Sequence, residues 1–377
     1  MKKTVLMMAV ALMTACSGQV NDGSTADSEP LQTDTSKPLR LAVAGVTHGH
    51  VGEVAGRVGR GDFEVVGVSE ENDAYRADNA LSSKVPATVF YKSLTEMLDQ
   101  TKPEVVAAYG SIKDHLAVVE AAAPRGIDVM VEKPLAASYK DALRILELAK
   151  QYNIKVVTNY ETTWYSTNHY AKQLVEEGKI GEVRRINVHD GHQGPFEIGC
   201  EPRFTDWLCD PELNGGGAVM DFGCYGADIV TWLRRGERPQ SVYAILQQNK
   251  PDKYPKVDDD ATIVLQYPGM TAQIMGSWCW PWNRKDMYIY GDNGYIFQRT
   301  GTRMDTLIGD ELSTDVDVPK LQQPFNDAFR YLKAVVRGDI EMQPYDLGGL
   351  ENNVIVVEIL EAAKKSAATG TRVELSM

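Results

Sequence analysis

Glu132, Lys133 and Pro134 stand where a short apolar run, IDVMV, comes to an end. Proline lacks a backbone donor and holds the residue before it in an extended conformation. Lys133 is therefore fixed at the carboxyl end of a predicted parallel strand, which is where ligands bind in such sheets. An ammonium there can hydrogen-bond a substrate hydroxyl and stabilise the charge that develops as the hydroxyl loses its proton. The alternative is a solvated loop lysine.

A second group of reactive side chains lies in GGGAVMDFGCYGAD, residues 215–228. The glycines let the backbone approach a ligand, and the predicted helix after them places Asp221, Tyr225 and Asp228 on one face. Asp221 can orient a substrate hydroxyl, and Tyr225 can pass its proton. Because the ordinary tyrosine pKa of about 10 is too high for a base near neutrality, we expect the Lys133 ammonium to lower it. Tyr225 can instead be a buried structural residue, and so can Asp228.

The stretch VAGVTHGHVG, residues 43–52, is placed like the phosphate-binding loop of a dinucleotide fold. The first glycine position is kept, whereas a threonine and a histidine occupy the second and third. The loop opens a helix whose first N–H groups can bind an anion. An acidic residue ends the next predicted strand, where it can accept ribose hydroxyls and repel a 2'-phosphate, so we expect NAD rather than NADP. The predicted cofactor contacts are Gly45, Val46, Thr47, His48 and Glu70.

His48 and His50 are of a type that can bind a metal. No acidic partner lies near them in the sequence, so we predict no metal site. The two side chains can instead pack or hydrogen-bond around the turn, or His48 can contact the cofactor phosphates.

The elements that position these groups follow two patterns. From Leu39 to about residue 160, apolar strands alternate with amphipathic helices. This predicts an α/β domain over residues 39–160, with a doubly wound, parallel Rossmann sheet covered on both faces. Beyond it strands follow one another closely, so residues 161–377 are predicted to form an α+β substrate and oligomerisation domain with a large, open, mostly antiparallel sheet. Helical stretches at 324–337 and 353–369 should pack on that sheet or return to the first domain.

The chain from about Leu39 onward resembles the Gfo/Idh/MocA family of sugar oxidoreductases. The matching pieces are, in order, LAVAGV, VAAYGSIKDHLAVVEAAAPRGIDVMVEKPLA, EEGKIGEVRRI, GGGAVMDFGCYGADI and EILEAAKKSAATGTRVEL. The resemblance implies nicotinamide-dependent oxidation or reduction of sugars and polyols, and an open-sheeted second domain that often builds dimers or tetramers. The family commonly has histidine four residues after the aspartate, so Tyr225 resembles its tyrosine branch. Proton transfer could then run through Tyr225, Lys133 or both.

The resemblance also suggests residues that surround the chemistry. His115 follows the fourth strand as the family's loop histidine does, and we expect it near the cofactor together with Glu132 and Lys133. The family's Arg-Phe stretch after the sixth strand is replaced by NYETTWYS, whose aromatic faces suit a sugar ring but can also be core. The candidates for the substrate wall are Trp164, Tyr165, His192 and Trp207, with His189 as a weaker one.

The amino-terminal residues MKKTVLMMAVALMTAC resemble a bacterial lipoprotein signal, residues 1–16, with lipid on the sulfur of Cys16. An ordinary cleaved signal is the alternative. The polar stretch 17–38 is predicted to be a flexible tether. We therefore expect an exported protein anchored to a bacterial membrane and facing the periplasm or the cell exterior. Its net charge of −13 argues against a nucleic-acid partner.

The other cysteines show no CxxC spacing, so a zinc site is not expected, although a Cys200–Cys209 bridge is conceivable in an exported protein. A chain exported unfolded carries no cofactor, and free NAD is expected to be scarce outside the cytoplasm. We therefore expect an oxidoreductase acting on a sugar or glycoside hydroxyl with tightly held, recycled NAD. The alternatives are a glycoside-cleaving lyase or hydrolase with a keto-sugar intermediate and resident NAD, and a non-catalytic sugar-binding lipoprotein.

Overall fold

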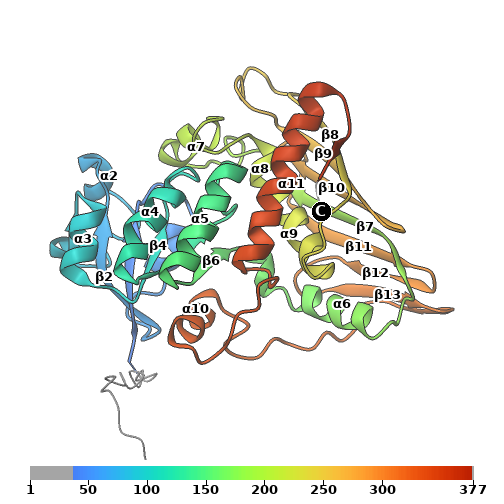
Figure 1. The fold of residues 1–377 in the computed structure, drawn as a ribbon, viewed down its shortest axis with the longest axis horizontal. Coiled ribbons are helices and arrows are strands. Elements are labelled where there is room, and N and C mark those ends of the chain that lie inside the picture. The colour runs from blue at the N-terminus through green and yellow to red at the C-terminus, as the bar shows by residue number, and fades with distance from the viewer. Residues whose placement is uncertain (1–36, 376–377) are drawn as a thin grey trace, which may run out of the picture. The chain divides into compact units, whose positions relative to one another are not determined.

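Six short apolar segments pair side by side in the computed structural model, which describes residues 37–375 (Figure 1). They are β1 (Leu39–Ala44), β2 (Phe63–Ser69), β3 (Phe90–Tyr91), β4 (Val105–Ala108), β5 (Asp128–Glu132) and β6 (Val156–Asn159). Every pairing is parallel, in the order β3-β2-β1-β4-β5-β6. The order reverses between β1 and β4, and ligands bind beyond the strands' carboxyl ends at such a reversal. The predicted Rossmann sheet is confirmed.

Helices cover this sheet because their apolar faces pack on its continuous Val and Ala surface. They are α1 (Val51–Ala55), α3 (Leu94–Thr101), α4 (Asp114–Ala122) and α5 (Tyr139–Tyr152), whereas α2 (Asp73–Ala77) has no buried residue. Ser93 and Ser138 begin α3 and α5, since each hydroxyl accepts a hydrogen bond from a backbone N–H three residues later. Helix α1 is short, and the chain after it turns through Gly59 and Gly61, both at positive φ.

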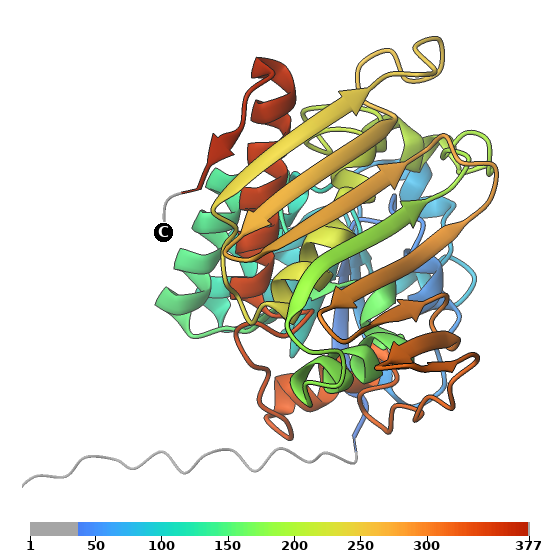
Figure 2. The same cartoon turned by 90° about the vertical axis from the view of Figure 1, so that its right-hand side faces the viewer.

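The second sheet has nine strands and is mostly antiparallel, as predicted. They are β7 (Val183–Gly191), β8 (Ser241–Gln247), β9 (Asp260–Tyr267), β10 (Met270–Ser277), β11 (Arg284–Gly291), β12 (Gly294–Gln298), β13 (Met304–Ile308), β14 (Glu311–Ser313) and β15 (Val373–Glu374). The order is β14-β13-β12-β11-β7-β10-β9-β8-β15, with one parallel pair, β7 and β10. Figure 2 looks onto its outer face, with the helices behind it.

Helices on the inner face of this sheet carry much of the site. They are α6 (Ser166–Glu176), α7 (Pro202–Leu208), α8 (Ala218–Asp221) and α9 (Gly223–Leu233). Ten consecutive residues of α9, Gly223 to Trp232, are buried. Gly226 must lack a side chain, because a Cβ there would lie 2.4 Å from a methyl carbon of Ile274 in β10. The helix that carries Tyr225 is thereby held directly against the sheet.

Two late helices return to the first domain. Helix α10 (Ala328–Arg337) packs Phe329, Leu332 and Val335 into a cluster with β1 residues. Helix α11 (Leu350–Thr369) contacts α5 on one side and α9 and β8 on the other (Figure 1). Its residues therefore belong to two apolar cores at once.

The predicted signal peptide, the lipidation site Cys16 and nearly all of the predicted tether lie outside the described residues. Within residues 37–375, no helix has the length and apolar character that a membrane crossing requires.

Candidate active site

A cavity of about 1100 Å³ joins the two sheets within one compact unit of the chain. Its lining combines the loop after β1, the lysine after β5, residues of α8 and α9, and the adjoining ends of β7 and β11. The three predicted catalytic residues, Lys133, Asp221 and Tyr225, all line it. The carboxyl edge of the parallel sheet thus meets the second domain where the strand order predicts a ligand.

Lys133 and Asp221 form a buried ion pair. Lys133 Nζ donates to Asp221 Oδ1 and, at 3.1 Å, to the Asp221 backbone oxygen. Asp221 Oδ2 accepts a hydrogen bond of 2.9 Å from Trp278 Nε1. Burial opposes both charges, but the Lys133 ammonium lowers the pKa of Asp221 to about 2, and Asp221 raises the pKa of Lys133. Lys133 is therefore a fixed positive charge at neutral pH and not a base.

Tyr225 stays a neutral phenol, contrary to the prediction that Lys133 would lower its pKa. Burial raises the pKa of Tyr225 well above its ordinary value, and nearby Asp190 acts in the same direction. Lys133 Nζ lies 5.1 Å from the centre of the ring and is bound to Asp221. Tyr225 can therefore donate a hydrogen bond or a proton into the cavity.

The sequence predicted that Asp221 and Tyr225 lie on one helix, but in the structure two helices carry them. Helix α8 ends at Asp221 and α9 begins at Gly223, with Phe222 between them. Asp228 faces away from the cavity, where its Oδ1 accepts a hydrogen bond of 2.7 Å from Asn352 Nδ2 in α11. Asp228 is thus a structural residue, which is one of the two alternatives the sequence left open.

The nucleotide loop keeps the glycine that its turn requires. Gly45 has a φ of 76°, and a Cβ there would lie 2.7 Å from the backbone nitrogen of Gly110. Val46 and Thr47 line the cavity. A Cβ at Gly49 would meet no atom within 4 Å, so the loop surface there is open to a ligand.

Glu70 lies at the end of β2 beside this loop. Its carboxylate accepts hydrogen bonds from the backbone N–H groups of Val46, at 3.3 Å, and Asn72, at 2.9 Å. A carboxylate has about four acceptor sites, so two remain for the hydroxyls of a ribose. The open loop surface at Gly49 and the remaining acceptor sites of Glu70 together fit a dinucleotide.

The His48 ring packs against aromatic side chains. Its ring centre lies 5.0 Å from that of Phe204 and 5.5 Å from that of Trp207, both in α7. Trp207 is 5% exposed and is not part of the cavity lining. The prediction that Trp207 forms the substrate wall is therefore wrong: this side chain supports the loop from behind.

His50 and Glu132 are hydrogen-bonded although 82 residues separate them. Glu132 Oε2 lies 2.9 Å from His50 Nδ1, and Glu132 Oε1 accepts from Asn159 Nδ2 at 3.0 Å. Burial opposes the Glu132 charge, yet the two histidines lower its pKa to about 2. Metal-ligating atoms of His48, His50 and Glu132 lie within 4.8 Å of one another.

The prediction of no metal site rested on the absence of an acidic residue near the two histidines in the sequence. In the structure Glu132, which is distant in sequence, lies beside them. These side chains nevertheless already bind one another. His48 Nδ1 accepts the backbone N–H of His50 at 3.1 Å, and both oxygens of Glu132 are engaged. Metal binding would have to break these hydrogen bonds. The expected absence of a metal stays a prediction.

The remaining predicted residues divide between the cavity and its surroundings. Tyr165 and His192 line it, and the Tyr165 hydroxyl donates to Glu161 Oε1 at 2.6 Å. Trp164 instead lines a smaller neighbouring cavity and packs on Tyr331. His115 and His189 are buried outside the lining, with Nδ1 atoms 3.2 Å from the Leu135 carbonyl oxygen and 3.0 Å from Asp286 Oδ1.

Sequence reasoning missed three charged residues beside Tyr225. Lys285, at the start of β11, lies with its Nζ 4.4 Å from the centre of the Tyr225 ring. The same atom is 2.7 Å from Glu161 Oε2 and 3.9 Å from Asp190 Oδ1. Charged residues within strands are a weak signal, because the long-range pairing that brings them together is not visible in the chain.

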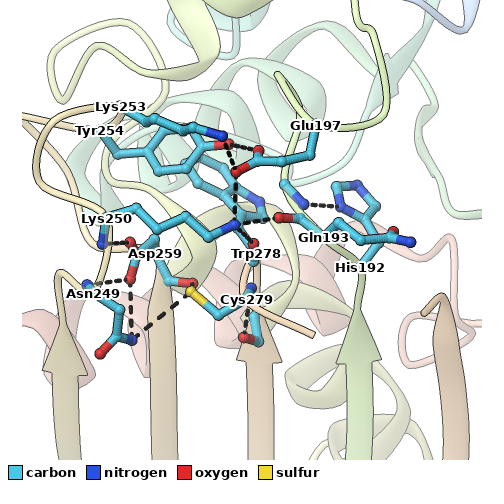
Figure 3. A network of polar contacts seen from close by, with 12 residues as sticks. His192, Gln193, Glu197, Asn249, Lys250, Lys253, Tyr254, Asp259, Trp278 and Cys279 are labelled. Carbon is cyan, nitrogen blue, oxygen red and sulfur yellow. Dashed lines mark hydrogen bonds and ion pairs between the residues drawn. The ribbon is translucent and has the colours of Figure 1, made fainter. Parts of the chain in front are cut away.

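The loop that follows β7 forms one wall of the cavity and is fixed by a polar network (Figure 3). Glu197 accepts from Lys250 Nζ at 2.7 Å, Lys253 Nζ at 2.8 Å and the Tyr254 hydroxyl at 2.6 Å. Lys250 Nζ also donates to the backbone oxygen of Trp278 at 2.8 Å. The wall and the tryptophan that holds Asp221 are thus joined by one lysine.

The four cysteines within the described residues are free thiols. The Cys200–Cys209 bridge considered from the sequence is therefore not formed. Burial raises the pKa of both thiols, which disfavours the reactive thiolate.

Two sequence models of one oxidoreductase family match the chain. The model described as "Oxidoreductase family, NAD-binding Rossmann fold" matches residues 39–160. The model described as "GFO/IDH/MocA C-terminal domain" matches residues 168–297. Together they match more than half of the chain, and the first identifies NAD as the cofactor that the loop and Glu70 fit.

Individual proteins are similar at low identity. The chain is 26% identical over 269 residues to a trans-1,2-dihydrobenzene-1,2-diol dehydrogenase of Xenopus tropicalis, covering 70% of this chain and 76% of that protein. It is 23% identical over 351 residues to a D-xylose 1-dehydrogenase (NADP(+)) of Haloarcula marismortui, covering 91% and 95%. These named relatives are dehydrogenases of compounds that carry hydroxyl groups.

Solved structures share the fold. An aldose-aldose oxidoreductase from Caulobacter crescentus complexed with glycerol superposes with a TM-score of 0.76 at 22% identity, covering 90% of this chain and 100% of that one. An inositol dehydrogenase homolog complexed with NAD+ from Azotobacter vinelandii superposes with a TM-score of 0.75 at 18% identity, covering 91% of this chain and 100% of that one.

Proposed function

The chain belongs to this Gfo/Idh/MocA oxidoreductase family, and from that premise we propose that it oxidises one hydroxyl of a sugar or glycoside to a carbonyl with NAD, or reduces that carbonyl with NADH. The observation that carries the proposal is the shared cavity, where the nucleotide loop faces the Lys133–Asp221 pair and Tyr225. NAD, when bound, accepts or supplies the hydride.

The protein's own residues handle the oxygen of the substrate. The Lys133 ammonium binds the reacting hydroxyl and stabilises the negative charge that grows on it. Asp221 holds that ammonium in place, and Trp278 holds Asp221. When a carbonyl is reduced, Tyr225, a phenol at neutral pH, gives its proton to the same oxygen and is reprotonated from solvent. Oxidation of a hydroxyl runs through the same steps in reverse, and the proton leaves to solvent through Tyr225.

We further propose that the protein is exported and keeps its NAD through repeated cycles. The support is the lipoprotein-like signal at Cys16. The name of the Caulobacter protein, aldose-aldose oxidoreductase, places aldoses on both sides of its reaction. A second sugar that reoxidises the nucleotide would let this chain work where NAD is not replenished.

A glycoside-cleaving activity is the second candidate. Ile198 and Trp282 line the cavity yet are 48% and 60% exposed, which suits contact with a group attached to the sugar. Oxidation to a keto sugar acidifies the neighbouring C–H and permits elimination of the glycosidic bond. Release of the attached group without net formation of NADH would distinguish this reaction from simple oxidation.

We also propose a homo-oligomer, a dimer or a tetramer, bound to a membrane through Cys16. The outer face of the large sheet carries stacked rings, among them Tyr288 and Phe297 with centres 3.9 Å apart. Light scattering of the purified protein tests the assembly, and mass spectrometry of the amino-terminal peptide tests the lipid.

The first experiment is to purify the protein, denature it and identify any released nucleotide by mass spectrometry. We expect NAD in an amount close to that of the protein. Single-turnover mixing with a panel of sugars and glycosides should then change the absorbance of the bound nucleotide, and a second sugar should reverse the change. No bound nucleotide and no response to added NAD across the panel would contradict the proposed function.

A further inference from the structure

Two lysines from different sheets face the same tyrosine. Lys133 follows β5, whereas Lys285 stands at the start of β11, and their Nζ atoms lie 5.1 and 4.4 Å from the centre of the Tyr225 ring. The proposed chemistry uses Lys133 alone. Lys285 also lines the cavity, and nothing in the reaction described so far accounts for it.

The contacts of Lys285 leave it able to bind a ligand. Its Nζ is 2.7 Å from Glu161 Oε2, and an ammonium carries three donors, so this contact uses one of them. Asp190 Oδ1, at 3.9 Å, is beyond hydrogen-bond distance of Lys285 Nζ and has no hydrogen-bond partner among the described residues. Burial raises the pKa of Asp190 to about 8 despite the opposing effect of Lys285, so the Lys285 charge at neutral pH is balanced by Glu161.

Positive and negative side chains are also paired around the rest of the cavity. Each arginine or lysine among its described lining residues has a carboxylate partner. The pairs are Lys133–Asp221, Lys285–Glu161, Arg203–Glu201, Arg284–Asp286 and Arg299–Asp305. A carboxylate on the substrate would find no cation without a counter-charge, and bringing an unmatched charge into a cavity is costly.

We propose that Lys285 binds a hydroxyl next to the reacting one, and that Glu161 neutralises it so that the site selects uncharged sugars over sugar acids. The inference rests on the proposed function and names its substrate class. Lys133 and Lys285, both near the Tyr225 ring, then hold adjacent oxygens of one vicinal diol. Lys285 contributes to binding, whereas Lys133 contributes to the chemical step.

The test compares matched sugars with two single substitutions in the full chain carrying its NAD. The probes are methyl glucoside, methyl galactoside and methyl mannoside, each paired with its uronic acid counterpart, in a nucleotide-reduction assay. Lys285→Gln should raise KM for the neutral sugars about tenfold, which corresponds to about 1.4 kcal/mol, and leave kcat within a few-fold. Glu161→Gln should shift the ratio of kcat/KM for uronate over neutral sugar upward by at least tenfold, because it frees the Lys285 charge.

Two variants control for misfolding and for general charge effects. Lys285→Arg keeps the positive charge and should recover most of the neutral-sugar KM. Lys179→Gln removes an exposed lysine that pairs with Glu177, and it should change neither parameter.

The outcomes separate the two proposals. A wild-type protein that reduces its NAD with neutral sugars, together with an unchanged preference in Glu161→Gln, would overturn the role of Lys285 and Glu161 while the proposed function stands. A kcat loss without a KM change in Lys285→Gln would also overturn it. A wild-type protein inactive on every pair would reject the proposed function, and the substrate class with it.

Discussion

Two ion pairs lie near the ring of Tyr225, and solvent reaches them to different extents. The side chains of Lys133 and Asp221 are 7% and 9% exposed, whereas those of Lys285 and Glu161 are 23% and 51% exposed. Water screens the second pair and barely reaches the first. The closed pair is suited to hold one charge in one place, and the open pair can share its donors with a ligand.

Breaking the closed pair should give the largest effect. Lys133→Met removes the positive charge beside the reacting oxygen, and we expect kcat/KM to fall by about 10²- to 10³-fold. The variant also leaves Asp221 buried without its partner, so thermal unfolding should shift to lower temperature. Activity within a few-fold of the wild type would show that Lys133 is not the stabilising charge.

Removing the Tyr225 hydroxyl leaves both lysines in place and should cost less. Tyr225→Phe keeps the ring that the two ammoniums face and removes the proton donor, so we expect kcat to fall about 10²-fold with little change in stability. Steady-state rates at several pH values check this. An unchanged kcat would show that the Tyr225 hydroxyl does not transfer the proton.

The closed pair should also be visible in the pH dependence of stability. The pKa of Asp221 is about 2 in the folded chain and about 3.9 when unfolded. Its contribution, roughly 2 to 3 kcal/mol, is present above pH 4 and is lost as the pH falls toward 2. Asp221→Asn lacks it, so the gap in unfolding free energy between wild type and variant should narrow over that range in urea titrations. A constant gap would contradict the assignment.

The carboxyl behind the open pair should give the opposite dependence of stability on pH. Burial raises the pKa of Asp190 to about 8, so the folded chain keeps a proton that the unfolded chain has lost above pH 4. Stability from this group therefore falls as the pH rises from 4 to 8. Asp190→Asn should match the wild type near pH 4 and exceed it progressively toward pH 8, as measured by thermal unfolding.

The sequence predicts the positions of one ion pair and not those of the other. Lys133 and Asp221 lie in short motifs whose local context, a strand end and a glycine-rich approach to a helix, fixes where they go. The alternation of apolar strands and helices likewise predicts the parallel sheet, and the close succession of strands beyond residue 160 predicts the antiparallel one. The local sequence pattern is therefore enough to predict the place of a side chain when its neighbours in the chain determine that place.

Lys285 and Glu161 could not be predicted in the same way. Their contact joins β11 to a short helical turn after β6, and 124 residues separate them. The contact between His50 and Glu132 could not be predicted for the same reason, because 82 residues separate them. The Tyr225 pKa was mispredicted because the burial that raises it, and the binding of Lys133 by Asp221, are not visible in the sequence.

Helix α11 shapes how the chain can fold. Leu350, Val354 and Val357 belong to the core of the parallel sheet, and Ile355 and Ile359 to the core of the second sheet. Neither core is complete until residues beyond 350 have been synthesised, so the amino-terminal domain cannot finish folding as it leaves the ribosome. If the protein is exported as proposed, both cores would be completed only after residues 350–369 have crossed the membrane.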